Sequence, residues 1–206
     1  VHAGCASGNH VLHQLESVQH AAETGFCVGH DRQEVVDESF AARLDANGSP
    51  VLLSDQVRSR WDRAQIARGS QALARADELA SARGSYAIQA AIAQCHAEAR
   101  SFEATDWVLI VSLYEDLCRL TPNPVAELNR AVAVSMASGP EAGLEILEQV
   151  SDQGQLRNSH LVPSVRGELL ARLGRTTEAR AELLRAATLT ENGPQRDVLR
   201  AKAAAL

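Results

Sequence analysis

Two short motifs near the N-terminus have a spacing that could bind a metal ion. His10 and His13 are separated by two residues, and so are Cys27 and His30. Imidazole and thiolate groups at this spacing are typical zinc ligands. No Cys-x-x-Cys pair accompanies them, and four glycines interrupt the segment. We therefore interpret residues 1–32 as an irregular, poorly ordered N-terminal segment and predict that they bind no metal.

A histidine in the middle of the chain lies in a short motif that is similar to part of an enzyme signature. His96-Ala97-Glu98 resembles the first half of a zinc deaminase signature, but the Pro-Cys-x-x-Cys half that completes it is absent. His96 and Gln89 lie two helical turns apart beside an apolar stripe, which favours a buried, hydrogen-bonding histidine over a catalytic one. No Walker loop, H-E-x-x-H, G-x-S-x-G or dinucleotide motif is present. We expect no enzyme activity and no cofactor, although a pocket could be lined by Asp55, Arg58, Arg60, His96 and Tyr114.

A stretch dense in charge surrounds one of the two tryptophans. Trp61 is large enough to be a packing anchor, and the guanidinium groups of Arg58 and Arg60 can each pair with a carboxylate. We interpret the stretch as the salt-bridged start of a helix, and a docking surface remains the alternative. Its candidate residues for a structural or interaction role are Asp55, Gln56, Arg58, Arg60, Trp61 and Asp62.

The elements that would position these residues are helices. Only 3% of the residues are aromatic and alanine is abundant, which is typical of closely packed helices. Asp62 is placed to cap a helix with an apolar side, and Ser85 to cap a second helix at residues 86–100. Thr105-Asp106 precedes a third helix. The apolar sides predicted for these three helices are Ile66, Gly69, Leu73 and Ala76; Ile88, Ile92, Cys95 and Ala99; and Trp107, Ile110, Val111, Tyr114, Leu117 and Cys118.

Elements before and after these three helices follow from local signals. Residues 33–44 predict a helix, and the Asn47-Gly48 turn signal predicts a short extended pair over residues 43–53. Pro124 suits the first turn of a further helix, which is so apolar that it must be covered on most sides. Asn129 and Arg130 are polar residues inside that apolar run.

A period of 36 residues relates two helical hairpins in the C-terminal part. The period pairs Ala131 with Gly167, Gly143 with Ala179, and Leu147 with Leu183. Paired helices with such a period are typical of stacked repeats. The second hairpin resembles a tetratricopeptide repeat. We therefore predict an all-α fold in which antiparallel helical hairpins stack as a tetratricopeptide-like right-handed solenoid over residues 33–206, with a last helix at residues 194–206 as its cap.

Charge and hydropathy exclude several classes of partner. The formal net charge is −6, with no excess of basic residues in either half, so we expect no direct nucleic-acid binding by this chain. No run has the length and apolarity of a membrane span, which predicts a cytoplasmic protein without membrane contact. The four cysteines have no paired spacing, and we expect them to be reduced.

Five blocks in order resemble the C-terminal extension found in a group of extracytoplasmic-function RNA polymerase sigma factors. The resemblance covers roughly residues 34–203. The blocks are Asp55-Gln56-x-Arg58-Ser59-Arg60-Trp61-Asp62, Gly84-Ser85-Tyr86-x-x-Gln89-Ala90-Ala91-Ile92-Ala93, Thr105-Asp106-Trp107, Asn129-Arg130-Ala131-Val132-Ala133 and Arg166-Gly167-x-Leu169-Leu170. Trp107, Asn129, Arg130 and Arg166 thereby join Gln89, His96 and the charged stretch as candidate interaction residues.

The resemblance implies a bacterial regulatory domain that acts through protein contacts. In that family a promoter-melting domain and a helix-turn-helix domain precede the extension, and we expect both to be missing from this chain, which begins with Val1. The implied partners are the sigma-factor domains, RNA polymerase or a regulator, and the implied role is the control of transcription initiation. A free-standing helical-repeat adaptor is the alternative, because it would use the same stacked surface.

Overall fold

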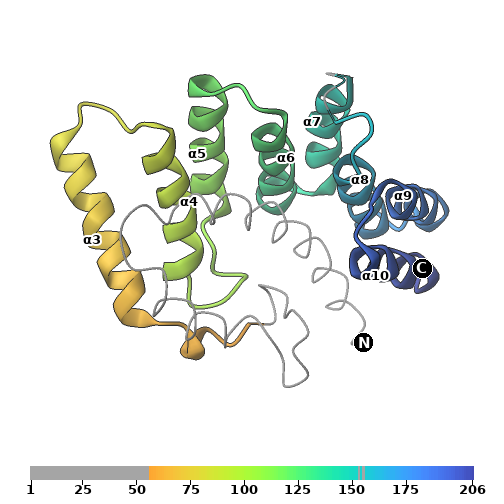
Figure 1. Cartoon of the computed structure of the whole chain (residues 1–206), viewed down its shortest axis with the longest axis horizontal. Coiled ribbons are helices and arrows are strands. Elements are labelled where there is room, and N and C mark those ends of the chain that lie inside the picture. The colour runs from red at the N-terminus through yellow and green to blue at the C-terminus, as the bar shows by residue number, and fades with distance from the viewer. Residues whose placement is uncertain (1–55, 153, 155) are drawn as a thin grey trace. The chain divides into compact units, whose positions relative to one another are not determined.

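A computed structural model describes residues 56–152, 154 and 156–206, and helix labels follow Figure 1. The described part is all-α and includes no strand, which confirms the predicted fold class. It divides into two compact units, residues 56–121 and Pro122–Leu206, each described separately below. The metal-spacing motifs, Asp55, the helix predicted at 33–44, the extended pair at 43–53 and the domain boundary at residue 33 lie outside the described residues.

The first unit contains a short 3₁₀ helix and three α-helices. These are η1 (Arg58–Arg60), α3 (Arg63–Leu79), α4 (Ser85–Glu98) and α5 (Trp107–Leu120). α4 packs against α3 on one side and α5 on the other. The predicted caps Asp62 and Asp106 are confirmed, since each carboxylate accepts a hydrogen bond of 2.9 Å from the backbone N–H three residues later.

Three local predictions for this unit are wrong. α4 begins at Ser85, with Gly84 as its extended N-cap, because the Gly84 carbonyl already accepts the first helical bond from Ile88. On α3 only Leu73 is buried and Ala76 is exposed, because α4 is the one described helix that α3 packs against. On α5, Leu113 takes the buried position expected for Val111, which is half-buried.

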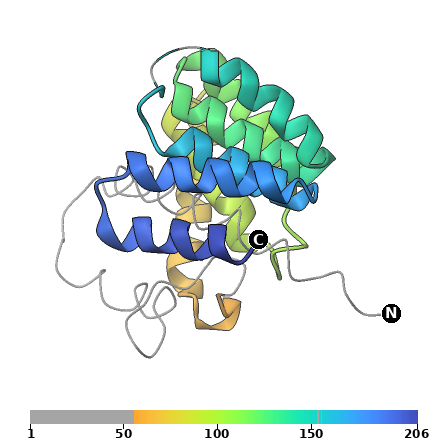
Figure 2. The same ribbon diagram turned by 90° about the vertical axis from the view of Figure 1, so that its right-hand side faces the viewer.

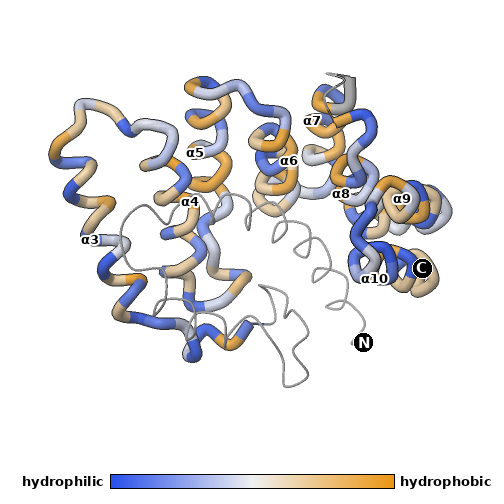
Figure 3. Tube along the Cα trace, in the orientation of Figure 1, coloured by the Kyte–Doolittle hydropathy of each residue, from blue (hydrophilic) through white to orange (hydrophobic). Residues whose placement is uncertain are grey.

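The second unit is built from five helices in the described residues. They are α6 (Pro124–Ser138), α7 (Pro140–Asp152), α8 (Leu161–Arg172), α9 (Thr176–Leu189) and α10 (Gly193–Ala204). α6 pairs with α7, α8 pairs with α9, and α7 packs against α8 between the pairs. α6 is buried along most of its length, as its apolar sequence predicts. Figure 3 shows hydrophobic residues concentrated on α6 and a largely hydrophilic α10.

Turns of defined geometry close both helix pairs. Gly139 alone separates α6 from α7, and its φ of 102° lies in the left-handed region that favours glycine. Gly174 follows α8 with a φ of 74°. The N–H of Gly174 donates to the carbonyl of Ala171, and the N–H of Arg175 donates to that of Leu170. These two hydrogen bonds form a Schellman motif, which ends α8.

The two helix pairs cross at equivalent positions 36 residues apart. A Cβ on Gly143 would lie 2.8 Å from the carbonyl oxygen of Ala131, and one on Gly167 would lie 3.2 Å from that of Ala179. Ala131 with Gly143 in the first pair therefore corresponds to Gly167 with Ala179 in the second. One glycine and one alanine let the helix backbones approach closely at each crossing.

The last helix packs on the second pair, as predicted. α9 and α10 lie side by side (Figure 2) around a core of Leu183, Ala186, Ala187, Leu199 and Ala203. Lys202 on α10 forms an ion pair of 2.5 Å with Glu168 on α8, and both side chains are almost fully buried. None of the helices in the described ranges is long and apolar enough to cross a membrane.

Candidate functional site

Two of the sequence blocks meet in the first unit at one group of side chains, which we call the Arg58 cluster. Its members are Arg58 on η1, Trp61 beside it, His96 on α4, Phe102 in the α4–α5 connection and Trp107 on α5. The packing of α4 between α3 and α5 brings these residues together, although they are up to 49 positions apart in the sequence.

Arg58 fastens the charged stretch to the C-terminal end of α4. Its Nη1 donates a hydrogen bond of 2.8 Å to the carbonyl oxygen of His96, one of the last carbonyls of that helix. Helix C-termini attract cations because their carbonyls lack partners within the helix. The guanidinium carbon also lies 4.1 Å from the centre of the Trp61 ring, a cation–π contact. Nη2 is buried and has no hydrogen-bond partner.

The prediction that Arg58 and Arg60 each pair with a carboxylate is wrong. Arg58 uses a backbone carbonyl instead, because η1 lies against the end of a helix. Arg60 is exposed, and no ion pair of its side chain is found within the described residues. Trp61 is half-buried under Arg58, so it anchors less apolar surface than a fully buried tryptophan.

His96 is a buried, neutral ring within the Arg58 cluster. It packs edge-on against Trp107 with ring centres 5.3 Å apart, and Phe102 packs against Trp107 in the same way. Burial lowers the pKa of His96 to about 4, and the charge of Arg58 contributes. The expected burial is confirmed, but the expected hydrogen bond is not formed at Nδ1, which is buried without a partner.

Acidification should destabilise the chain through His96. Between pH 6.5 and about 4 the unfolded chain binds a proton at this ring that the folded chain does not, so the free energy of unfolding rises with pH across that window. We expect a loss of about 3 kcal/mol from pH 7 to pH 4 relative to the His96→Leu variant, measured by urea unfolding. An equal loss in both proteins would show that His96 does not control this dependence.

The other candidates of the first unit lie on or beside the same helices. Gln89 donates a 3.3 Å hydrogen bond to the Ser85 carbonyl of its own helix. Asp62 caps α3, Gln56 is half-buried, and Tyr114 is buried on α5.

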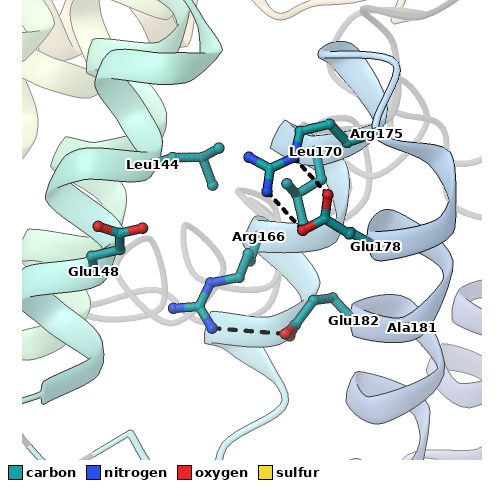
Figure 4. Close-up of a pocket in the computed structure, with 8 residues that line it drawn as sticks. All are labelled: Leu144, Glu148, Arg166, Leu170, Arg175, Glu178, Ala181 and Glu182. Atoms are coloured by element: carbon teal, nitrogen blue, oxygen red, sulfur yellow. Dashed lines mark hydrogen bonds and ion pairs between the residues drawn. The ribbon is translucent and has the colours of Figure 1, made fainter.

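Three candidates lie in the second unit. Asn129 is buried on α6, and Arg130 donates from Nε to the Glu127 carboxylate at 2.8 Å. Arg166 on α8 lies in a pocket, with its Nη1 3.8 Å from Glu182 Oε1 on α9 (Figure 4). Sequence reasoning missed Glu182, although its place one turn after Glu178 on the predicted helix is a detectable signal.

Two cysteines, neither in a disulfide, lie within the part of the chain that the structure describes. Cys95 and Cys118 are both half-buried thiols, and burial raises the pKa of Cys95. In the ranges that the structure describes, no group of three or more His, Cys, Asp or Glu residues is placed to hold a metal ion. The Arg58 cluster itself consists of an arginine bonded to a helix carbonyl, a cation–π contact and edge-on aromatic packing.

Comparisons with known proteins connect the chain to sequences of unassigned function. A model of the family of unknown function DUF6596 matches residues 37–77, which include the charged stretch and most of α3. An uncharacterized protein of Rhizobium meliloti (strain 1021) is 46% identical over 161 residues, equal to 77% of this chain and 37% of that protein. The chain thus spans little more than a third of that relative's length. No solved structure matches the chain.

Proposed function

We propose that this chain is the regulatory C-terminal extension of an extracytoplasmic-function sigma factor, a tetratricopeptide-like domain that acts through protein contacts. The observation that carries the proposal is the Arg58 cluster. Two blocks of the resemblance, the charged stretch and Thr105-Asp106-Trp107, supply Arg58, Trp61 and Trp107 to one site, where they meet at His96. Their meeting fixes the charged stretch, with the exposed Arg60, against α4.

The equivalent crossings of the two helix pairs support the tetratricopeptide-like part of the proposal. Repeats of this kind stack helix pairs at a fixed period, and small residues are needed where the helices cross. Gly143 and Gly167 have that role in the two pairs. Stacked pairs build an extended surface that binds other proteins.

The charged stretch is the part best placed to meet a partner. Arg58 holds it against α4, while Arg60 is exposed and Trp61 is half-exposed beside it. An exposed arginine next to an aromatic ring is typical of residues that dominate protein interfaces. We propose that this surface contacts the sigma-factor domains, RNA polymerase or a regulator, and that it does not bind DNA directly, since the net charge is −6.

The length of the curated relative favours an extension over a free-standing adaptor. In the Rhizobium meliloti protein, the segment similar to this chain forms 37% of the whole. The similar segment in that protein is therefore joined to a longer remainder, as an extension would be.

An arginine substitution in a full-length relative that carries the same charged stretch tests the proposal. The equivalent of Arg60→Ala should abolish promoter-reporter output while changing stability by less than about 0.5 kcal/mol, because Arg60 is exposed. Thermal melting of the same protein measures the second quantity. Arg68→Ala is the matched control, since Arg68 is an exposed arginine on α3 outside the Arg58 cluster.

A second substitution, Arg58→Ala, distinguishes a structural role of the charged stretch from a role in binding a partner. Arg58→Ala should lower the melting temperature, because it removes the bond to the α4 carbonyl and the contact with Trp61. If Arg60→Ala and Arg58→Ala both leave reporter output at the wild-type level in a folded protein, the charged stretch has no role in transcription and the proposal fails.

A further inference from the structure

A pocket of about 340 Å³ opens among α7, α8 and α9 of the second unit. Leu144, Leu170 and Ala181 give it an apolar wall, and charged side chains from all three helices surround that wall (Figure 4). The volume is at the lower end of the range for ligand pockets, which suits a single long side chain. The charged lining residues are Glu148, Arg166, Arg175, Glu178 and Glu182.

The charges of this pocket are unevenly matched. Arg175 and Glu178 form a two-pronged pair, with N–O distances of 2.8 and 2.7 Å, and so neutralise each other. Arg166 lies between two carboxylates, Glu148 and Glu182, on facing walls of the pocket. The lining residues alone are two arginines and three glutamates, and Arg185, outside the lining, adds a positive charge 3.7 Å from Glu182.

Glu182 is the carboxylate with unused hydrogen-bonding capacity. Its side chain is only 21% exposed, yet its oxygens lie 3.8 Å from Arg166 and 3.7 Å from Arg185, beyond hydrogen-bond distance. Oε2 has no hydrogen-bond partner. A carboxylate this far buried normally accepts several hydrogen bonds, because losing its hydration is costly.

We propose that this pocket receives one arginine or lysine side chain from a peptide segment of a partner protein. The basic head would donate to Glu182, after a small turn of that carboxylate, and would face Glu148 across the pocket. Its methylene stem would pack on Leu144 and Leu170. An anion would instead compete with Glu178 and Glu182 for the arginines. The inference rests on the proposed function, since it names the kind of partner.

Binding can be measured with two synthetic probes of the same length, one with a charged guanidinium and one with a neutral ureido group. The first is the peptide acetyl-Leu-Arg-Leu-amide, and the second carries citrulline, the neutral analogue of arginine, in its place. We expect the arginine peptide to bind the full chain at least tenfold more tightly in an NMR titration, because a charged hydrogen bond is lost in the analogue. The shifted backbone signals should come from the pocket residues of α7, α8 and α9.

Substitutions identify the carboxylate that recognises the peptide. Glu182→Gln should weaken binding of the arginine peptide about tenfold, and Glu148→Gln should weaken it less, because Glu148 is exposed. Glu145→Gln is the matched control, an exposed glutamate on α7 outside the pocket, and should change nothing. Melting curves confirm that each variant is folded.

Three results would overturn the inference. They are equal binding of the arginine and citrulline peptides, shifts confined to another surface, and free arginine binding as tightly as the peptide. A failure here can be told from a failure of the proposed function. If the peptide does not bind but Arg60→Ala still abolishes reporter output in the full-length relative, only the pocket assignment is wrong.

Discussion

Replacing Lys202 by methionine should lower the free energy of unfolding by about 3–5 kcal/mol. The ammonium group of Lys202 lies 2.5 Å from Glu168, and the two side chains are only 10% and 6% exposed. Methionine preserves most of the side-chain volume but leaves the Glu168 carboxylate buried without this counterion. Urea unfolding followed by circular dichroism measures the difference.

Two further variants show whether the loss of stability comes from the Glu168 carboxylate that is left buried without Lys202. The double variant Lys202→Met with Glu168→Leu should recover most of the stability, because a buried ion pair is often replaced by apolar side chains at little cost. Arg175→Met removes an exposed pair with Glu178 and should cost far less, because solvent screens exposed charges. Similar losses for Lys202→Met and Arg175→Met would contradict the argument.

Replacing Gly143 by alanine should destabilise the chain by about 3 kcal/mol, the upper end of the range for overpacking. The added Cβ would lie 2.6 Å from the Cβ of Ser135 and 2.8 Å from the carbonyl oxygen of Ala131. The obstructing atoms belong to the backbone and first side-chain carbon of α6, so relief requires α6 and α7 to separate. Gly167→Ala should cost less, because its nearest neighbours are atoms of the Leu183 side chain, which can shift.

The matched control for this substitution is Gly69→Ala on α3. Among the described residues, no atom beyond its chain neighbours and the adjacent backbone of α3 lies within 4 Å of the position that its Cβ would take. Alanine should therefore raise stability by roughly 0.5–1 kcal/mol through its better helix propensity. Opposite signs for the two glycines are the decisive result. If Gly143→Ala is neutral or stabilising, the close crossing of α6 and α7 is wrong.

Local signals predicted most of the helices and their ends. Asp62, Asp106 and Gly174 act through bonds to residues three or four positions away, so their roles can be recognised from the sequence. The 36-residue period also aligned the residues that lie at the two helix crossings, because equivalent positions in a repeat share an environment.

The details of the candidate site depend on contacts that local patterns do not encode. Arg58 bonds to a backbone carbonyl 38 residues away, and sequence reasoning assigned it a carboxylate instead. His96 Nδ1 is buried without a hydrogen-bond partner where the ring of His96 on α4 packs against Trp107 on α5. Glu182 belongs to the proposed binding pocket because it lies opposite Glu148, and the 36-residue period alone does not specify that position.

Glycine lies on the second helix of the first pair and on the first helix of the second pair, with alanine opposite it each time. This arrangement restricts how such a chain can change its length during evolution. Each crossing has room for the methyl group of one alanine, on either helix of the pair, and not for two. Duplicating a whole 36-residue unit would carry a complete crossing with it. A shorter insertion within a helix would rotate a larger side chain into the contact. Homologues should therefore differ in length by whole units, or in the connections between helices.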